Sequence, residues 1–77
     1  MMKFANVIRD HMDLIMHTAF TGGGSKNDRR EMIESLKDQA MNLITGAELS
    51  GGICAAKAES YRDAIMDEYY DLMTYLE

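Results

Sequence analysis

Asp13 and His17 stand four residues apart, with Asp10 close by. On a helix, that spacing places both side chains on one face, where a carboxylate could assist a histidine base or help it hold a metal ion. A zinc site needs three or four ligands, and the other histidine, His11, projects toward the apolar side of the same stretch. We therefore interpret Asp13 and His17 as an exposed polar pair, and we expect no catalytic residue, no bound metal and no cofactor.

Cys54 is the only cysteine of the chain and stands where a helix should begin. A helix N-terminus lowers the pKa of a thiol and can make it a nucleophile. Here the helical periodicity places Cys54 on the apolar side beside Ala58, and no histidine lies near it in sequence. We predict a small core residue. A lone cysteine cannot form an internal disulfide, so we expect an intracellular, cytoplasmic protein.

A glycine-rich segment, residues 21–26, ends in a lysine just before a helix start and therefore looks like a phosphate-binding loop. The phosphate loop requires G-x-x-x-x-G-K-[ST] after a strand, and both the spacing and the preceding helical pattern differ here. Free N–H groups at the following helix start, beside Lys26, Arg29 and Arg30, could still hold an anion. A flexible linker is the interpretation that the composition favours.

The elements that position these residues follow from the breaks in the chain. Proline is absent from the 77 residues, and the six glycines fall in three places. Between them, apolar residues recur with helical spacing, which predicts helices at about 3–20, 28–45 and 53–76. Asp28 and Glu31 have the form of a capping box, and Gly46 is a suitable helix end. The prediction is an all-α three-helix bundle, a single helical domain over residues 1–77.

The first and third expected helices have apolar arcs that approach half of the circumference, wider than the 100° of an ordinary surface helix. We infer that both carry surface satisfied by another chain, either a second copy, giving a dimer, or a different protein. The alternative is that a tight three-helix core absorbs these side chains. No run of about 18 apolar residues is present, so we expect no membrane association.

The net charge of −5 comes entirely from the residues after Thr45, where seven acidic side chains face two basic ones. The acidic groups that point away from the apolar arc are Glu59, Asp63, Asp67 and Asp71. This sign of charge disfavours direct binding to nucleic acid, whose phosphates need a positive surface, and we expect none. A solvated face and a docking face for a basic partner both remain open.

The third expected helix also carries all four tyrosines of the chain and two marginal methionines. Tyrosine and methionine are typical of adaptable protein-binding surfaces. Tyr70 falls on the acidic face, where the core offers no reason for an aromatic residue. The candidate partner-binding residues are therefore Met66, Tyr69, Tyr70, Met73, Asp63, Asp67 and Asp71.

Three short motifs carry a resemblance: Leu43-Ile44-Thr45-Gly46, Gly52-Ile53 and Tyr61-Arg62-Asp63-Ala64, followed by an acidic helix. Together they resemble the C-terminal half of short helical proteins encoded among the structural genes of tailed bacteriophages. Those proteins often have a more glycine-rich turn within the last helix. In this chain, residues 55–58 are rich in alanine instead. The resemblance implies a phage-encoded, non-enzymatic helical protein, either part of the virion or directed at a host machine in the host cytoplasm. It transfers no site residue.

Two functions follow as hypotheses. The first is a non-enzymatic protein–protein interaction protein that docks through the apolar faces of the first and third helices. The second is an acidic inhibitor of a nucleic-acid-processing host enzyme, in which the carboxylates of the third helix imitate phosphates. An enzyme built on Asp13 and His17 ranks below both.

Overall fold

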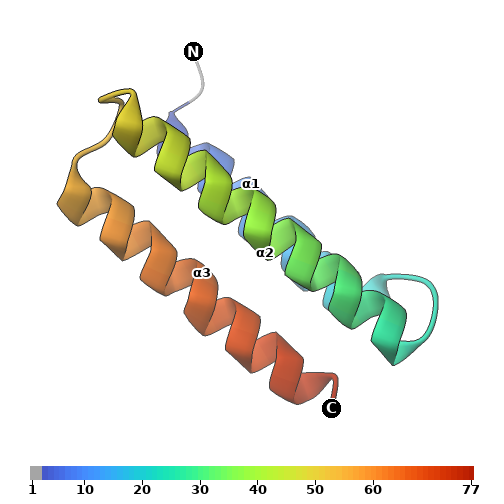
Figure 1. Ribbon diagram of the computed structural model, residues 1–77. Coiled ribbons are helices and arrows are strands. Elements are labelled where there is room, and N and C mark those ends of the chain that lie inside the picture. The colour runs from blue at the N-terminus through green and yellow to red at the C-terminus, as the bar shows by residue number, and fades with distance from the viewer. Residues whose placement is uncertain (1–2) are drawn as a thin grey trace.

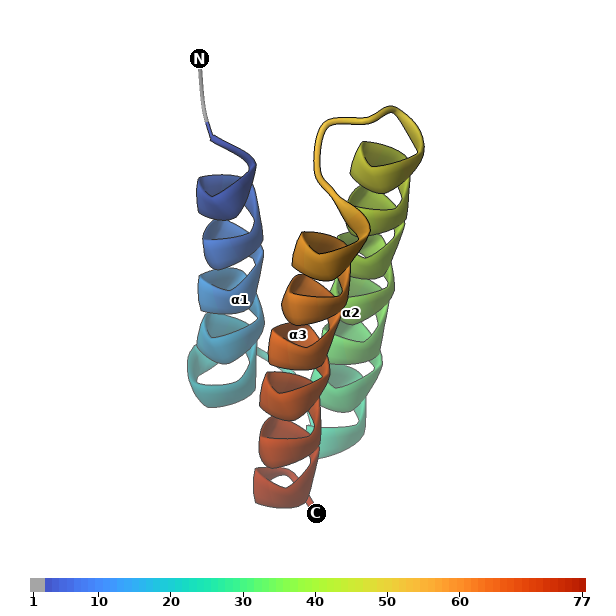
Figure 2. The same ribbon diagram turned by 90° about the vertical axis from the view of Figure 1, so that its left-hand side faces the viewer.

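The computed structural model describes residues 3–77, which form three helices: α1 (Phe4–Thr21), α2 (Lys26–Leu49) and α3 (Ala55–Tyr75). The chain turns back on itself twice, so α1 and α3 run in one direction and α2 runs in the other (Figures 1 and 2). All three helices pack together, and the predicted all-α three-helix bundle is confirmed. The predicted domain over residues 1–77 includes Met1 and Met2, which lie outside the described residues.

The core consists of two clusters of buried apolar side chains, and each cluster draws on all three helices. One cluster comprises Ile8, Ala40, Ile44, Ala58 and Ile65. The other comprises Ile15, Ala19, Ile33, Leu72 and Leu76. The alanines have no exposed surface, which lets the helices approach closely. Full burial of each isoleucine stabilises the fold by roughly 1.5–3 kcal/mol relative to exposure.

The second helix begins earlier than predicted, because Ser25 rather than Asp28 is the N-cap. The backbone N–H of Asp28 donates to Ser25 Oγ at 3.2 Å, and the N–H of Ser25 donates to Asp28 Oδ2 at 3.2 Å. This reciprocal pair is a capping box that satisfies two free donors of the helix start. The predicted box of Asp28 with Glu31 is therefore wrong by three residues, and the capped helix start leaves less room for an anion.

The second helix also ends later than predicted. Gly46 lies inside α2 with no left-handed backbone, whereas Gly51 has a φ of 80° and ends the turn. After it, the N–H of Gly52 donates to the carbonyl of Ala47 at 2.8 Å, which satisfies a carbonyl at the helix end. The prediction that the helix ends at residue 45 is wrong, because a helix ends where the backbone reverses and not at every glycine.

The third helix begins at Ala55, and Cys54 is its N-cap with an extended backbone (φ −83°, ψ 165°). The predicted start at 53 is therefore wrong by two residues. Helical periodicity does not apply to a residue outside the helix, and the Cys54 side chain is exposed, so the prediction of a core cysteine is wrong as well. Ile53 packs against the first core cluster in its place.

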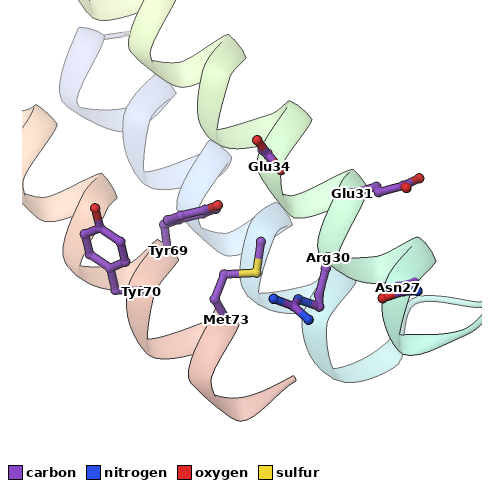
Figure 3. Close-up of a pocket in the computed structure, with 7 residues that line it drawn as sticks. All are labelled: Asn27, Arg30, Glu31, Glu34, Tyr69, Tyr70 and Met73. Atoms are coloured by element: carbon purple, nitrogen blue, oxygen red, sulfur yellow. The ribbon is translucent and has the colours of Figure 1, made fainter. Parts of the chain in front are cut away.

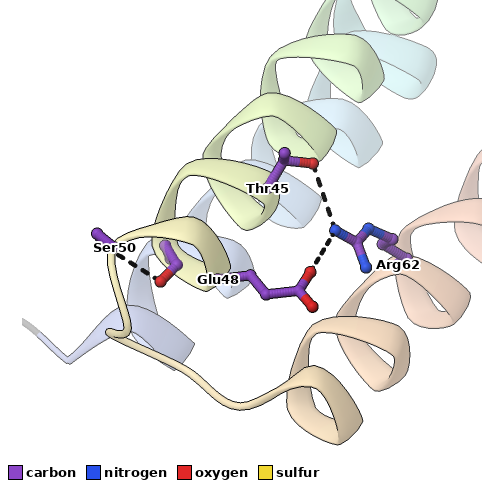
Figure 4. Close-up of polar contacts among 5 residues, drawn as sticks. Thr45, Glu48, Ser50 and Arg62 are labelled. Carbon is purple, nitrogen blue, oxygen red and sulfur yellow. Dashed lines mark hydrogen bonds and ion pairs between the residues drawn. The ribbon is translucent and has the colours of Figure 1, made fainter.

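Polar contacts join the helices at both ends of the bundle. Arg62 of α3 donates to Glu48 Oε1 of α2 at 2.8 Å and to Thr45 Oγ1 at 3.3 Å (Figure 4). At the opposite end, Arg29 of α2 donates to the carbonyl of Ala19 in α1 at 3.4 Å, where a cation also complements the helix C-terminus. Within residues 3–77, no helix has the length and apolar character that a membrane crossing requires.

Candidate functional site

A shallow groove of about 440 Å³ lies between α2 and the C-terminal half of α3. Its lining residues are Asn27, Arg30, Glu31, Glu34, Tyr69, Tyr70 and Met73. Tyr69 and Met73 point toward α2, and the ring of Tyr70 stands at the outer rim (Figure 3). The fold therefore brings together three of the predicted partner-binding residues. It adds four residues of α2 that the sequence pattern of α3 alone could not reveal.

Tyr69 holds this groove in shape. Its half-buried side chain packs against the second core cluster, and the Lys37 Nζ atom lies 4.8 Å from the ring centroid. The Tyr70 ring meets the Tyr69 ring edge to face, with centroids 5.5 Å apart. Tyr70 is 61% exposed, so its ring is held in position by Tyr69 while most of its surface remains accessible to a partner. Such a ring loses little conformational entropy when a partner covers it.

Lys37 contributes a fixed positive charge to the wall of α2. Its ammonium lies 2.8 Å from a carboxylate oxygen of Asp38. The hydrogen bond to Asp38 raises the pKa of Lys37 above its ordinary value; burial opposes this, and the charges of Asp38, Tyr69 and Glu34 add to it. Lys37 therefore stays protonated at neutral pH and keeps its contact with the Tyr69 ring.

The predicted acidic residues form a row on the outside of α3. Glu59, Asp63, Asp67 and Asp71 are exposed and follow each other at intervals of four residues, about 6 Å along the helix axis. None of them takes part in an ion pair with residues 3–77, where the ion pairs are Lys37–Asp38 and Arg62–Glu48. Their charge is therefore available to a partner.

A second apolar patch borders the acidic row on its other side, where α1 and α3 meet. The rings of Tyr75 and Phe20 are in contact, with centroids 4.7 Å apart and a tilt of 57° between them, yet these residues remain 57% and 50% exposed. Met16, one turn before Phe20 on α1, is 41% exposed. At 100° per residue, Asp67 and Asp71 fall between Tyr70 and Tyr75 around α3. We call Tyr70, Met73, the four acidic residues, Tyr75 and Phe20 the α3 surface.

Comparison of the chain with protein-family models, with curated proteins and with solved structures found no match. The interpretation of the α3 surface therefore depends on its own geometry and charge.

Met66 differs from the other predicted residues of this surface. Its side chain is half-buried on the side of α3 that faces α2, and it does not line the groove. Phe20, by contrast, belongs to the α3 surface, as part of the apolar face of the first helix through which docking is predicted, although it is not one of the candidate partner-binding residues. Its place as the last apolar residue before the linker was the available signal, because a helix end has no further turn of a neighbour to cover it.

The residues that could carry out chemistry do not converge. Asp13 and His17 are both exposed, and no hydrogen bond joins them. Nδ1 of the half-buried His11 lies 3.3 Å from the carbonyl oxygen of Val7 in its own helix. In the part of the chain that the structure describes, no three His, Cys, Asp or Glu side chains gather closely enough to share a metal ion.

Proposed function

We propose that this protein is a non-enzymatic protein-binding protein that docks a basic partner along the α3 surface, using the apolar side chains of α3 and α1. One observation carries the proposal. Three aromatic side chains are half or more exposed on the two sides of Asp67 and Asp71: Phe20, Tyr70 and Tyr75. The acidic row that ends at Asp71 has no ion-pair partners among residues 3–77.

The aromatic side chains supply the affinity in this proposal. A buried aromatic side chain hides 150–250 Å², so covering the exposed half of one ring removes on the order of 100 Å² from water. At about 25 cal/mol per Å², each ring then contributes roughly 2.5 kcal/mol to docking. Aromatic anchors of this size are typical of the residues that dominate protein interfaces.

The acidic row supplies the selectivity. Carboxylates in the centre of the contact favour a partner that presents lysine or arginine between two apolar contacts, because a neutral or acidic partner would leave these charges unpaired. The resemblance to short helical proteins of tailed bacteriophages supports a phage-encoded protein whose partner is a virion component or a host protein in the host cytoplasm.

A second candidate function has its own support in the unpaired acidic row. The protein would inhibit a nucleic-acid-processing host enzyme by presenting carboxylates in place of phosphates. The row carries one charge per about 6 Å, whereas one DNA strand carries one per 3.4 Å of helix axis. The acidic row would therefore reproduce only about half of the charge density of a DNA strand. This makes phosphate mimicry the weaker candidate.

The two candidates separate when the rings and the carboxylates are removed independently. One variant carries Tyr70→Ser and Tyr75→Ser, and the other carries Glu59→Gln, Asp63→Asn, Asp67→Asn and Asp71→Asn. Leu49→Ser removes an apolar side chain that is 83% exposed away from this surface, and Asp10→Asn with Asp13→Asn removes carboxylates from α1. These two serve as matched controls. Each immobilised protein is incubated at 150 mM salt with lysates of the native host prepared before and after phage infection.

The proposed function predicts a host or phage protein that wild type and both controls retain, that the ring variant loses, and that the carboxylate variant retains more weakly. The phosphate-mimic candidate predicts loss in the carboxylate variant and unchanged retention in the ring variant. Retention that all the variants share, or that the controls lose equally, would overturn both candidates. Circular dichroism of each variant confirms that the helices remain folded.

A further inference from the structure

The outer side of the α1–α2 pair carries a second surface, which α3 does not touch. A groove of about 410 Å³ is lined there by His11 of α1 and by Gln39, Asn42 and Leu43 of α2. Exposed apolar side chains accompany it: Leu14 is 48% exposed, Met32 54% and Leu43 40%. We call the residues His11, Leu14, Met32, Gln39, Asn42, Leu43 and Gly46 the α1–α2 face.

On α2, no member of the α1–α2 face carries a permanent charge, although 27% of the chain is charged. On α1, the exposed Asp10 stands one turn before Leu14 and marks the outer edge of the face. At 100° per residue, Met32, Gln39, Leu43 and Gly46 fall within about 60° of each other around α2. The charged residues in the same stretch, Glu34, Lys37 and Asp38, fall about 100° or more from the centre of that arc. The charges of α2 are thus turned toward α3 and the groove beside it, where Lys37 contacts the Tyr69 ring.

Gly46 adds an open position to the same side of α2. It lies in the last turn of α2 with a helical backbone, where glycine is a poorer helix former than alanine. It has no positive φ, and a Cβ built on it would meet no atom of this chain within 4 Å. Neither the backbone conformation nor the internal packing of the chain therefore requires a glycine here. A missing side chain beside an exposed apolar groove leaves room for the backbone of another chain.

We propose that the α1–α2 face binds a second copy of this chain, forming a two-fold symmetric dimer. Charge favours this occupant, because the whole net charge of −5 arises after Thr45, and the acidic row lies on α3. Two copies that meet through their α1–α2 faces keep the acidic rows on the outside. Any arrangement through α3 would bring like charges together.

The polar groups of the face also suit a copy of itself. In a two-fold interface each residue lies close to symmetry-related residues of the same set, so the surface must be self-complementary. The side-chain amides of Gln39 and Asn42 both donate and accept hydrogen bonds, and they can pair with their own copies. A face built on carboxylates or ammonium groups could not do so.

The size of the face predicts a weak, reversible dimer. The 18 residues of α1 give the face a length of about 27 Å, and the two helices, each about 10 Å wide, give it a width of about 20 Å. Its flat area is therefore on the order of 500 Å² per copy. A stable standard interface takes about 800 Å² per partner. We therefore expect association at micromolar protein concentrations.

Sedimentation velocity at 1–500 µM tests the proposal on the full chain. The variant Gln39→Glu with Asn42→Asp places two carboxylates on the α1–α2 face at exposed positions that the fold does not need. Its control, Ser60→Asp with Thr74→Asp, adds the same charge at exposed positions of α3. We expect wild type and control to dimerise alike, and the first variant to raise the dissociation constant at least tenfold. A wild type that stays monomeric to 500 µM, or equal weakening in the control, would overturn the proposal.

Gly46→Ala gives an answer that does not depend on added charge. Alanine should raise the melting temperature of the monomer at low concentration, because it favours the helix and meets no atom of its own chain. The same methyl group should weaken the dimer several-fold. A variant that gains both monomer stability and association would contradict close approach at this glycine. Binding of a partner to the α3 surface should persist in all these variants, so failure of the dimer leaves the proposed function intact.

Discussion

The α3 surface and the α1–α2 face are outer surfaces of one small bundle, but their composition is opposite. The α3 surface carries a row of four exposed carboxylates, and exposed aromatic rings lie on both sides of its end at Asp67 and Asp71. The α1–α2 face carries aliphatic side chains, amides and a glycine, with no permanent charge. This difference indicates that the distribution of charge can direct two different partners to two sides of one small domain.

This separation has an energetic basis. An acidic surface repels its own copy and attracts basic partners, so it selects a different protein. An uncharged surface has no long-range preference and binds only what fits it closely, which a symmetric copy can do. Both surfaces depend on the same two core clusters, so the first prediction concerns what they share.

Ile33→Ala should affect both surfaces and have the largest effect. The Ile33 side chain is fully buried and packs in the cluster that joins α1, α2 and the end of α3. Its truncation should lower the free energy of unfolding by about 2–5 kcal/mol. This loss is a large share of the roughly 4–12 kcal/mol of total stability expected for a domain of this length. Urea denaturation followed by circular dichroism measures the change.

The conservative variant Ile33→Val serves as the control and should lose only about 0.5–1.5 kcal/mol. Partner binding and dimerisation should both fall in Ile33→Ala and both survive in Ile33→Val. If Ile33→Ala abolished one surface and left the other fully active, the two surfaces would not share a single cooperative core.

The second prediction separates the surfaces. Replacing Glu59, Asp63, Asp67 and Asp71 by their amides removes three like-charge pairs at i,i+4 spacing. Each such pair costs about 0.2–0.5 kcal/mol. The variant should therefore gain roughly 1 kcal/mol of stability in thermal unfolding at low salt, and the gain should shrink at 1 M salt because the wild-type repulsion is screened.

Dimerisation through the α1–α2 face should not change in this carboxylate variant, because that face does not contain the row. The Asp10→Asn, Asp13→Asn variant of α1 should show a smaller gain, since those residues are three apart and only two in number. Unchanged or lowered stability in the α3 variant would mean that the carboxylates make stabilising contacts in solution.

The sequence predicted the parts of this molecule that depend on long periodic patterns. Three helices, their order and the outward position of Tyr70 follow from the spacing of apolar residues over many turns, and the structure confirms each. The acidic row is likewise exposed, as expected from its place opposite the core residues of α3. Periodicity averages over a whole helix, so single exceptions do not disturb it.

The parts that failed depend on single residues. The predicted ends of α2 are wrong because Ser25, not Asp28, is the N-cap and because Gly46 keeps a helical backbone. Cys54 was misplaced because it stands one residue outside α3. The exposure of Met32 and Leu43 does not follow from the sequence, because a helical pattern shows which face is apolar but not how far a neighbour covers that face. The α1–α2 face could therefore appear only in the folded structure.

The smallest predicted effect concerns the ion pair of Lys37 with Asp38, which lies on the side of α2 away from the α1–α2 face. The hydrogen bond to Asp38 raises the pKa of Lys37 above 10.5 in the folded protein. A raised lysine pKa stabilises the folded state fully below pH 10.5, and this contribution disappears as the pH rises through the folded pKa. Because the Asp38 side chain is 62% exposed, the contribution is only about 0.5 kcal/mol.

Asp38→Asn should therefore be less stable than wild type by that small amount at pH 8, and the difference should shrink as the pH rises through the pKa of Lys37. Taking the difference between the two proteins cancels the ionisation of the tyrosines, which both contain. Asp10→Asn provides the control, since the ion pairs among residues 3–77 do not include Asp10. Urea denaturation between pH 8 and 12 checks the result. If the stability difference between the two proteins grew with pH, Asp38 would not stabilise the protonated form of Lys37. The ion pair would then not fix the position of the Lys37 ammonium on the α3 side of α2.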